Sequence, residues 1–234
     1  MSQLLITGAT GQLGSQIVSE LTAKYPIAQL SVLARSSEKG LPFTEKGITV
    51  KIGNYQDPSS LVEAMQGIDS VLLISSSDFN DRIGQHKNVI DAAKAAGVQH
   101  IFYTGVAIKD IETSPLKPLL GDHFETEEYI KQSGLTYTFL RNSLYADVVP
   151  MFIGANVLET GVFFPAGEGK VAFANRNDLA KAIAQIIASN GHENKTYHLT
   201  GSQAHSFSEI ASYLSELSGK EVPYISPSSA DFEN

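Results

Sequence analysis

The stretch that decides the fold of this chain is TGATGQLG, from Thr7 to Gly14. It follows the short apolar run Leu4–Thr7, which predicts a buried strand, and it precedes a segment in which Leu13, Ile17 and Leu21 recur at helical spacing. The glycines at positions 8, 11 and 14 therefore stand in a strand–turn–helix context. In such a turn one glycine permits the tight bend, one lets a pyrophosphate approach the backbone, and one allows the helix to pack against the strand.

The start of the helix after this turn is a favourable place for an anion. Its first N–H groups have no acceptor within the helix, and the helix dipole adds partial positive charge there. The spacing is G-x-x-G-x-x-G rather than G-x-G-x-x-G, and a merely tight turn between strand and helix is the alternative interpretation. We favour a dinucleotide-binding turn, because the glycines lie between a predicted strand and a predicted helix.

Short β-rich runs alternate with segments of helical spacing up to about residue 141. The predicted strands are Leu4–Thr7, Leu30–Ala34, Ile48–Ile52, Ser70–Ile74, His100–Thr104 and Thr136–Leu140. Helices are predicted at Leu13–Leu21, after the cap Asp57-Pro58, at Ile83–Ala93 and at Asp122–Gln132. Such alternation requires right-handed crossovers, so the sequence predicts an α/β fold, a Rossmann-type doubly wound parallel sheet over residues 1–141.

The alternation loosens in residues 142–234, which predict a smaller α/β substrate lobe, interleaved with the first domain and lying over the carboxyl ends of its sheet. Helices are expected at Asp178–Ala188 and Phe207–Leu217, and strands at Thr196–Leu199 and Val222–Ile225. The polar end SPSSADFEN leads toward another helix, so we expect that this lobe continues beyond the sequence.

Composition excludes several classes of function. The 234 residues contain no Cys, which excludes disulfides, thiolate zinc sites and cysteine catalysis. The net charge of −8, with no basic run, argues against nucleic-acid binding. No apolar stretch is long enough to cross a membrane, and the N-terminus does not read as a signal peptide. We therefore expect a cytoplasmic protein, monomeric or homodimeric, without a membrane partner.

Arg35 follows the second predicted strand, about 20 residues after the glycines. In dinucleotide-binding folds the residue at this place contacts the ribose next to the adenine. NAD sites usually place an acid here, whereas the planar guanidinium of Arg35 suits a 2′-phosphate. Ser36 and Lys39 add hydrogen-bond donors nearby. An ordinary solvated arginine is the alternative; we favour recognition of the phosphate, and hence NADPH over NADH as the cofactor.

These motifs in combination resemble the NmrA-like branch of the atypical short-chain dehydrogenases, and within it the bacterial NADPH:quinone oxidoreductases and the triphenylmethane-dye reductases. The likeness covers most of the chain and rests on TGATGQLG, LLISSS (72–77), QHKNVIDAAKAAGV (85–98), ETE (125–127), LTYTFLRN (135–142) and GEGK (167–170). The resemblance implies an NADP site made by Gly8, Ala9, Thr10, Gly11, Gln12, Leu13, Arg35, Ser75, Ser76, Ser77, Asn142, Ser143, Leu144, Tyr145, Ala146, Asp147 and Arg176. From the residues alone, Ser75–Ser77 also fit a simple polar loop.

The catalytic pair Tyr-x-x-x-Lys of the wider superfamily is absent, because the corresponding stretch reads His123-Phe-Glu-Thr-Glu127. This argues against alcohol–ketone interconversion and against sugar epimerisation by that mechanism. His123 and Tyr145 are the candidate proton donors near an acceptor, with a surface or helix-capping histidine and a core tyrosine as the alternatives. His86 is expected to be a packing residue, and the other histidines are too scattered to predict a metal site.

The resemblance implies an NADPH-dependent oxidoreductase that passes a hydride to a quinone or a similar small acceptor. Reduction of such an acceptor requires few catalytic side chains, because the cofactor supplies the hydride. The chain supplies orientation and a cleft that excludes water. A non-catalytic NmrA-like redox sensor that binds NADP is the alternative from another class. Dye or azo reduction differs only in the acceptor.

Overall fold

The computed structural model describes residues 3–232 and divides the chain into two compact units. The first unit combines the chain up to Asn142 with Arg176–Leu199, and the second combines Ser143–Asn175 with the chain from Thr200 onward. The chain first passes from one unit to the other after Asn142, one residue beyond the boundary expected after residue 141. The segment 176–199, however, belongs with the first unit rather than with the smaller lobe, because its strand pairs with the sheet of the first unit.

A seven-stranded sheet forms the centre of the first unit, in the order β3-β2-β1-β4-β5-β6-β9, with every neighbouring pair parallel. Its strands are β1 (Leu4–Ile6), β2 (Leu30–Ala34), β3 (Thr49–Ile52), β4 (Ser70–Ile74), β5 (His100–Val106), β6 (Thr136–Asn142) and β9 (Lys195–Leu199). The order reverses between β1 and β4. This is the switch point at which open α/β sheets bind ligands, beyond the carboxyl ends of the strands.

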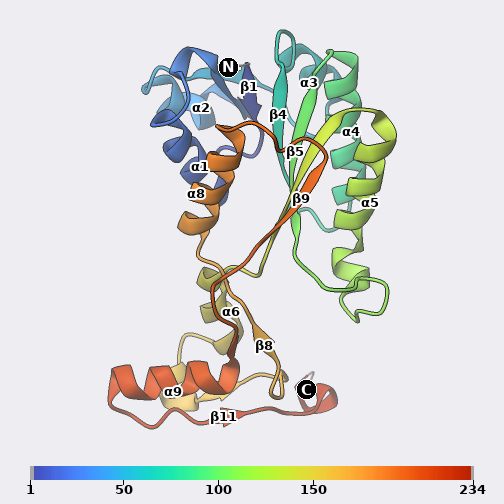
Figure 1. Ribbon diagram of the computed structural model, residues 1–234. Coiled ribbons are helices and arrows are strands. Elements are labelled where there is room, and N and C mark those ends of the chain that lie inside the picture. Colours follow the sequence, from blue (N-terminus) through green and yellow to red (C-terminus); the bar gives the residue numbers. More distant parts are fainter. Residues whose placement is uncertain (1–2, 233–234) are drawn as a thin grey trace. The chain divides into compact units, whose positions relative to one another are not determined.

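Helices cover both faces of this sheet (Figure 1). One face carries α1 (Gln12–Thr22) and α8 (Arg176–Ile187), which pack on each other; the other carries α3 (Pro58–Ala64), α4 (Arg82–Ala95) and α5 (Lys117–Ser133). The helix α2 (Ser37–Thr44) packs on β2 and β3, and a short 3₁₀ turn, Ile27–Gln29, precedes β2. The predicted doubly wound Rossmann-type sheet is confirmed.

The central strands β1, β2, β4 and β5 are largely buried on both faces, which explains their nearly continuous apolar sequences, whereas the edge strands β3 and β9 are partly exposed. Leu5 and Leu73 belong to the core cluster beneath α3, α4 and α5, while the alternate residues Ile6 and Leu72 are buried as well. On α1, the predicted apolar stripe of Leu13, Ile17 and Leu21 is buried.

Local signals set several of the helix ends. Asp57 caps α3 by accepting a hydrogen bond from the backbone N–H of Ser60 at 3.2 Å, and Pro58 occupies the first turn. Gly134 ends α5 with a φ of 83°, in the left-handed region that favours glycine. The helix α2 was not expected, because Gly40 and Pro42 are poor residues for a helix interior.

The second unit is smaller and has its own core. Its elements are a 3₁₀ turn (Ala146–Val148), α6 (Val149–Ile153), α7 (Val157–Thr160), β7 (Val162–Phe163), β8 (Lys170–Val171), β10 (His205–Ser206), α9 (Phe207–Ser218), β11 (Tyr224–Ile225) and α10 (Ser229–Phe232). The strands form two short pairs, β10 with β8 and β11 with β7. Ser206 and Glu209 form a reciprocal capping box at the start of α9. Among residues 3–232, no helix is both long and apolar enough to span a bilayer.

Candidate functional site

The glycine-rich turn joins β1 to α1 at the switch point of the sheet, and each glycine has a different role. Gly8 has a φ of 61°, which permits the bend. A Cβ on Gly14 would lie 2.2 Å from the carbonyl oxygen of Gly8, so only glycine lets the helix pack this closely on the turn. A Cβ on Gly11 would meet only that same oxygen, at 3.3 Å, and is otherwise in open space. Gly11 therefore faces outward, where a ligand would approach.

The N-terminus of α1 is suited to an anion. Gly11 is its cap residue and supplies no side-chain hydrogen bond, and the first turn holds no acidic residue. The N–H groups of Gln12, Leu13 and Gly14 have no acceptor within the helix, by the geometry of a helix start. Together with the dipole of this eleven-residue helix, they fit a pyrophosphate.

A partly buried pair of hydroxyls, here called the Thr7–Tyr55 clamp, fixes the turn relative to the end of β4. The hydroxyl oxygens of Thr7 and Tyr55 lie 2.5 Å apart, and Tyr55 donates to the carbonyl oxygen of Ile74 at 2.8 Å. Thr7 donates to the carbonyl of Leu72 at 3.0 Å and accepts from the N–H of Ile74 at 3.2 Å. Burial raises the pKa of Tyr55 far above its usual value, so this hydroxyl stays neutral. Nothing in the sequence pattern pointed to Tyr55.

Arg35 follows β2 at the same edge of the sheet and is exposed. Within residues 3–232 it forms no ion pair or hydrogen bond through its side chain, so its guanidinium is available to a ligand. The Oγ of Ser36 accepts a hydrogen bond from the N–H of Lys39 at 3.3 Å and thereby caps α2. The ammonium of Lys39 lies on the exposed side of the same turn. The grouping of Arg35 with Ser36 and Lys39 fits a phosphate.

The Ser75–Ser77 loop follows β4, and the structure separates the roles of its serines. Ser76 faces the protein, because its hydroxyl donates to Oε1 of Gln85 at 2.7 Å. The contact between Ser76 and the cofactor stays a prediction, with this hydroxyl already engaged by the protein. Within the described chain, the hydroxyls of Ser75 and Ser77 have no protein partner, and the N–H of Ser75 donates to Oγ1 of Thr104 at 2.9 Å. Ser75 and Ser77 remain the serines that can contact a ligand.

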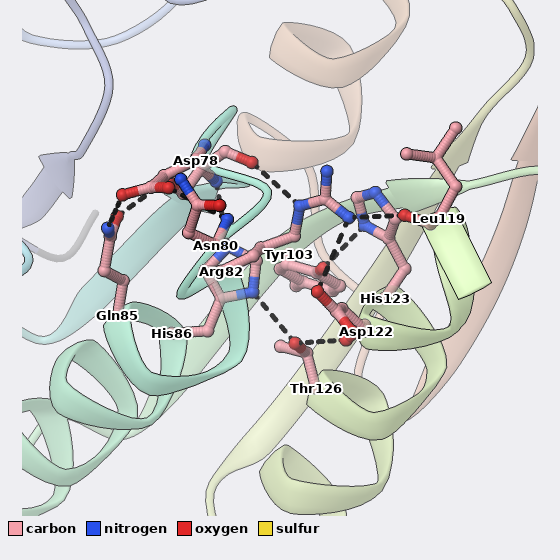
Figure 2. Close-up of polar contacts among 11 residues, drawn as sticks. Asp78, Asn80, Arg82, Gln85, His86, Tyr103, Leu119, Asp122, His123 and Thr126 are labelled. Atoms are coloured by element: carbon pink, nitrogen blue, oxygen red, sulfur yellow. Dashed lines mark hydrogen bonds and ion pairs between the residues drawn. The ribbon is translucent and has the colours of Figure 1, made fainter. Parts of the chain in front are cut away.

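His123 is neither a surface residue nor a helix cap. It is 8% exposed in the middle of α5, and its Nδ1 lies 2.8 Å from the hydroxyl of the fully buried Tyr103 (Figure 2). Burial, with a smaller contribution from the nearby Arg82 cation, lowers the pKa of His123 to about 4. The imidazole is therefore uncharged at neutral pH and is poorly placed to act as an acid.

The lysine position of the absent Tyr-x-x-x-Lys pair is filled by Glu127, which forms a buried ion pair. The side chain of Glu127 is 3% exposed and that of Arg141 is 20% exposed. Arg141 donates from Nε to Oε1 at 2.8 Å and from Nη2 to Oε2 at 2.5 Å, a two-point contact that ties α5 to β6. The stretch from His123 to Glu127 thus supports the scaffold and offers no catalytic phenol or ammonium.

The remaining predicted residues follow β6 or begin α8. Asn142 ends β6 at the same sheet edge and is buried. The run from Ser143 to Asp147 belongs to the second unit, where Tyr145 pairs with Ala174 in an isolated parallel bridge. Tyr145 is partly exposed there, and Arg176 begins α8 in the first unit. The structure therefore gathers the glycine turn, Arg35, the serines and Asn142 at one edge, and describes Ser143–Asp147 within the other unit.

His86 is buried, as predicted for a packing residue, and it also forms polar contacts. His86 is fully buried, and both ring nitrogens have partners, the N–H of Ser76 and the hydroxyl of Thr126. In the part of the chain that the structure describes, no group of three or more His, Asp or Glu residues is placed to hold a metal ion.

Comparison with known proteins places this site in a family. The chain is 44% identical over 230 residues to Quinone oxidoreductase 2 of Escherichia coli (strain K12), which covers 98% of this chain and 79% of that protein. The structure of NADPH-dependent quinone oxidoreductase QOR2 from Escherichia coli complexed with NADPH superposes with a TM-score of 0.89 at 41% identity, over 98% of this chain and 80% of that one. The Citrobacter sp. triphenylmethane reductase complexed with NADP(H) gives a TM-score of 0.89 at 39% identity, over 99% and 81%.

The family model described as the NmrA-like family matches residues 1–234, the whole length of the sequence. Together with the parallel sheet and the glycine turn at its switch point, this match shows that the chain belongs to the NmrA-like family.

Proposed function

We propose that this chain is an NADPH-dependent oxidoreductase that transfers a hydride to a quinone or a similar small acceptor. The observation that carries the proposal is the N-terminus of α1, where the cap residue Gly11 supplies no side-chain hydrogen bond, together with the exposed guanidinium of Arg35 at the same sheet edge. The relatives named above are a quinone oxidoreductase and a dye reductase, both of which use NADPH or NADP(H). The quinone-like acceptor, the cytoplasmic location and the monomeric or homodimeric state stay predictions from the sequence.

The residues present fit the dinucleotide in three places. The first-turn N–H groups of α1 would bind the pyrophosphate, Arg35 the 2′-phosphate, and the loop with Ser75 and Ser77 the nicotinamide ribose. The nicotinamide, when bound, supplies the hydride. The chain's own residues bind and orient it, and the Thr7–Tyr55 clamp holds the first and third of these places at a fixed spacing.

The protein provides no dedicated acid among the residues of α5. His123 is uncharged at neutral pH, because burial lowers its pKa to about 4, and its Nδ1 is already engaged by Tyr103. A quinone is electron-poor enough to accept a hydride without prior protonation. Its oxygens then take protons from water, so the described side chains need only orient the acceptor and the cofactor.

Steady-state oxidation of NADPH with a panel of quinones tests the proposal directly. Turnover with at least one quinone is expected, together with saturable NADPH binding by calorimetric titration. Tight NADPH binding without turnover on any quinone, azo compound or triphenylmethane dye would favour the alternative, a redox sensor that binds the nucleotide only. Turnover on dyes but not on quinones would keep the enzyme and change its acceptor.

Selectivity for NADPH depends on Arg35. A hydrogen bond to a charged group is worth about 1.5–3 kcal/mol, so Arg35→Ala should weaken NADPH binding about 10- to 150-fold and leave NADH nearly unchanged. Lys94→Ala is the matched control, because it removes an exposed cation from the far end of α4. If Arg35→Ala loses the same binding affinity for NADPH and for NADH, this arginine does not recognise the 2′-phosphate.

A further inference from the structure

Every polar backbone and side-chain atom of Ser76 is held by the protein. Its N–H donates to Nε2 of His86 at 2.9 Å, and its carbonyl oxygen accepts from Nε of Arg82 at 3.0 Å. Its hydroxyl donates to Gln85 and accepts from the N–H of Asp78 at 3.1 Å. Three of these partners come from the first turns of α4, the helix that follows the loop (Figure 2). These four hydrogen bonds fix the backbone and the hydroxyl of Ser76, the central residue of the loop.

We propose that His86 is a positioning residue, whose Nε2 fixes Ser76 and so holds the Ser75–Ser77 loop in the shape that orients the nicotinamide end of the cofactor. This inference rests on the proposed function and adds to it a residue that does not itself touch the ligand. The loop begins one residue after Ile74, which the Thr7–Tyr55 clamp already fixes. His86 fixes the next stretch of the same segment.

The hydrogen bonds determine which nitrogen of His86 carries the proton. A backbone N–H can only donate, so Nε2 must be the acceptor from Ser76. In the neutral ring Nδ1 then bears the hydrogen and donates to Oγ1 of Thr126 at 2.8 Å, and Thr126 donates in turn to the carbonyl oxygen of Asp122 at 2.7 Å. This chain runs from α5 through His86 to the loop and has one consistent direction.

Arg82 reinforces the same connection. It is buried, donates from Nη1 to the carbonyl oxygen of Leu119 at 3.0 Å, and has the carboxylate of Asp122 at 3.8 Å. Figure 2 shows Arg82 and His86 between the segment that carries Asp78 and the α5 residues Asp122 and Thr126. The face of α5 that lacks the Tyr–Lys pair thus supports α4, and α4 supports the loop.

Two substitutions of similar size separate the two hydrogen bonds of His86. In His86→Gln the side-chain oxygen can reach the place of Nε2 and accept from Ser76, whereas in His86→Asn it can reach only the place of Nδ1. We expect His86→Gln to keep kcat within about threefold of the wild type. We expect His86→Asn to lose about tenfold or more in kcat with a smaller change in KM for NADPH, because a misplaced reacting group slows the chemical step.

Hydrogen exchange gives a second readout that does not need turnover. The amide of Ser76 should be protected in the wild type and in His86→Gln, and should exchange faster in His86→Asn, with or without NADPH. His100→Asn is the matched control, because it removes a half-buried imidazole, bonded to Thr138, at the first residue of β5, the opposite end of that strand from the site. It should change Tm without changing exchange at Ser76.

The outcomes are distinguishable from those of the proposed function. A wild type that binds NADPH but turns over no acceptor overturns the enzyme proposal, and the exchange comparison then still decides the role of His86. Equal kinetics and equal Ser76 exchange in the Gln and Asn variants would overturn the positioning role. If His86→Asn does not fold, His86→Leu takes its place, since leucine offers no acceptor to the N–H of Ser76; unchanged kcat and unchanged Ser76 exchange in that variant would also overturn the positioning role.

Discussion

Acid should weaken this protein through the two buried histidines of the first unit. Burial is the larger cause that lowers the pKa of His86 to about 3 and of His123 to about 4, from 6.5 in an exposed histidine. Between the folded and the unfolded pKa values, these two imidazoles therefore bind protons in the unfolded chain and remain neutral in the folded chain. Below pH 6.5 the free energy of unfolding falls, and the loss continues until the pH reaches the folded pKa.

The size of the effect follows from these values. At pH 5 an unfolded histidine lies about 1.5 units below its pKa, and one unit corresponds to about 1.36 kcal/mol. Each of the two histidines should thus lower the free energy of unfolding by about 2 kcal/mol between pH 7 and pH 5. Carboxyl groups titrate over the same range, but they contribute equally to the wild type and to a histidine variant, so the difference isolates the imidazole.

Urea denaturation at pH 7 and pH 5 measures this difference. His86→Gln should lose about 2 kcal/mol less than the wild type on acidification, whatever its stability at pH 7. His198→Gln removes an exposed imidazole and should follow the wild type. If His86→Gln and the wild type lose the same free energy, then His86 is protonated in the folded state and the hydrogen-bond direction argued from Ser76 is wrong.

Further predictions concern the turn and α5. Gly14→Ala should lower stability by about 1–3 kcal/mol, measured by urea denaturation, because its Cβ meets backbone at 2.2 Å. Gly11→Val should fold, as circular dichroism would show, yet lose both nucleotides; normal affinity would contradict the turn assignment. Glu127→Gln should cost about 3 kcal/mol by leaving a partly buried guanidinium without its anion. His123→Ala and Tyr145→Phe should each slow quinone reduction well short of the roughly 10²–10⁴-fold loss of an essential acid; a larger loss with intact NADPH affinity would reveal one.

The sheet and its glycine turn were predictable because their signals are local. Strands such as Leu30–Ala34 and Ser70–Ile74 match the predicted bounds, since a β-rich run between turn residues needs no distant partner to be recognised. The attachment of β9 to β6 was not predictable, because it depends on pairing across more than fifty intervening residues. Hence α8 and β9 were expected in the smaller lobe.

The candidate site was predictable only at positions where the residue type and its place in the sequence together indicate a single role. The glycines and Arg35 carry such a signal. Ser76 does not, because a serine after a strand can face a ligand or its own helix, and only the positions of Gln85 and His86 decide between them. The environment of His123 on α5 likewise depends on Tyr103, a residue of the strand β5.

The place of β9 in the sheet also has a consequence for synthesis. The ribosome makes β1 to β6 in order, but the strand that completes their sheet at β6 arrives only after Ser143–Asn175 of the other unit has been made. During synthesis, the backbone groups along one edge of β6 therefore remain unpaired while part of the second unit is being made. A chain released before Lys195 would expose that edge to other molecules, so premature termination in this gene should yield aggregates rather than a smaller folded domain.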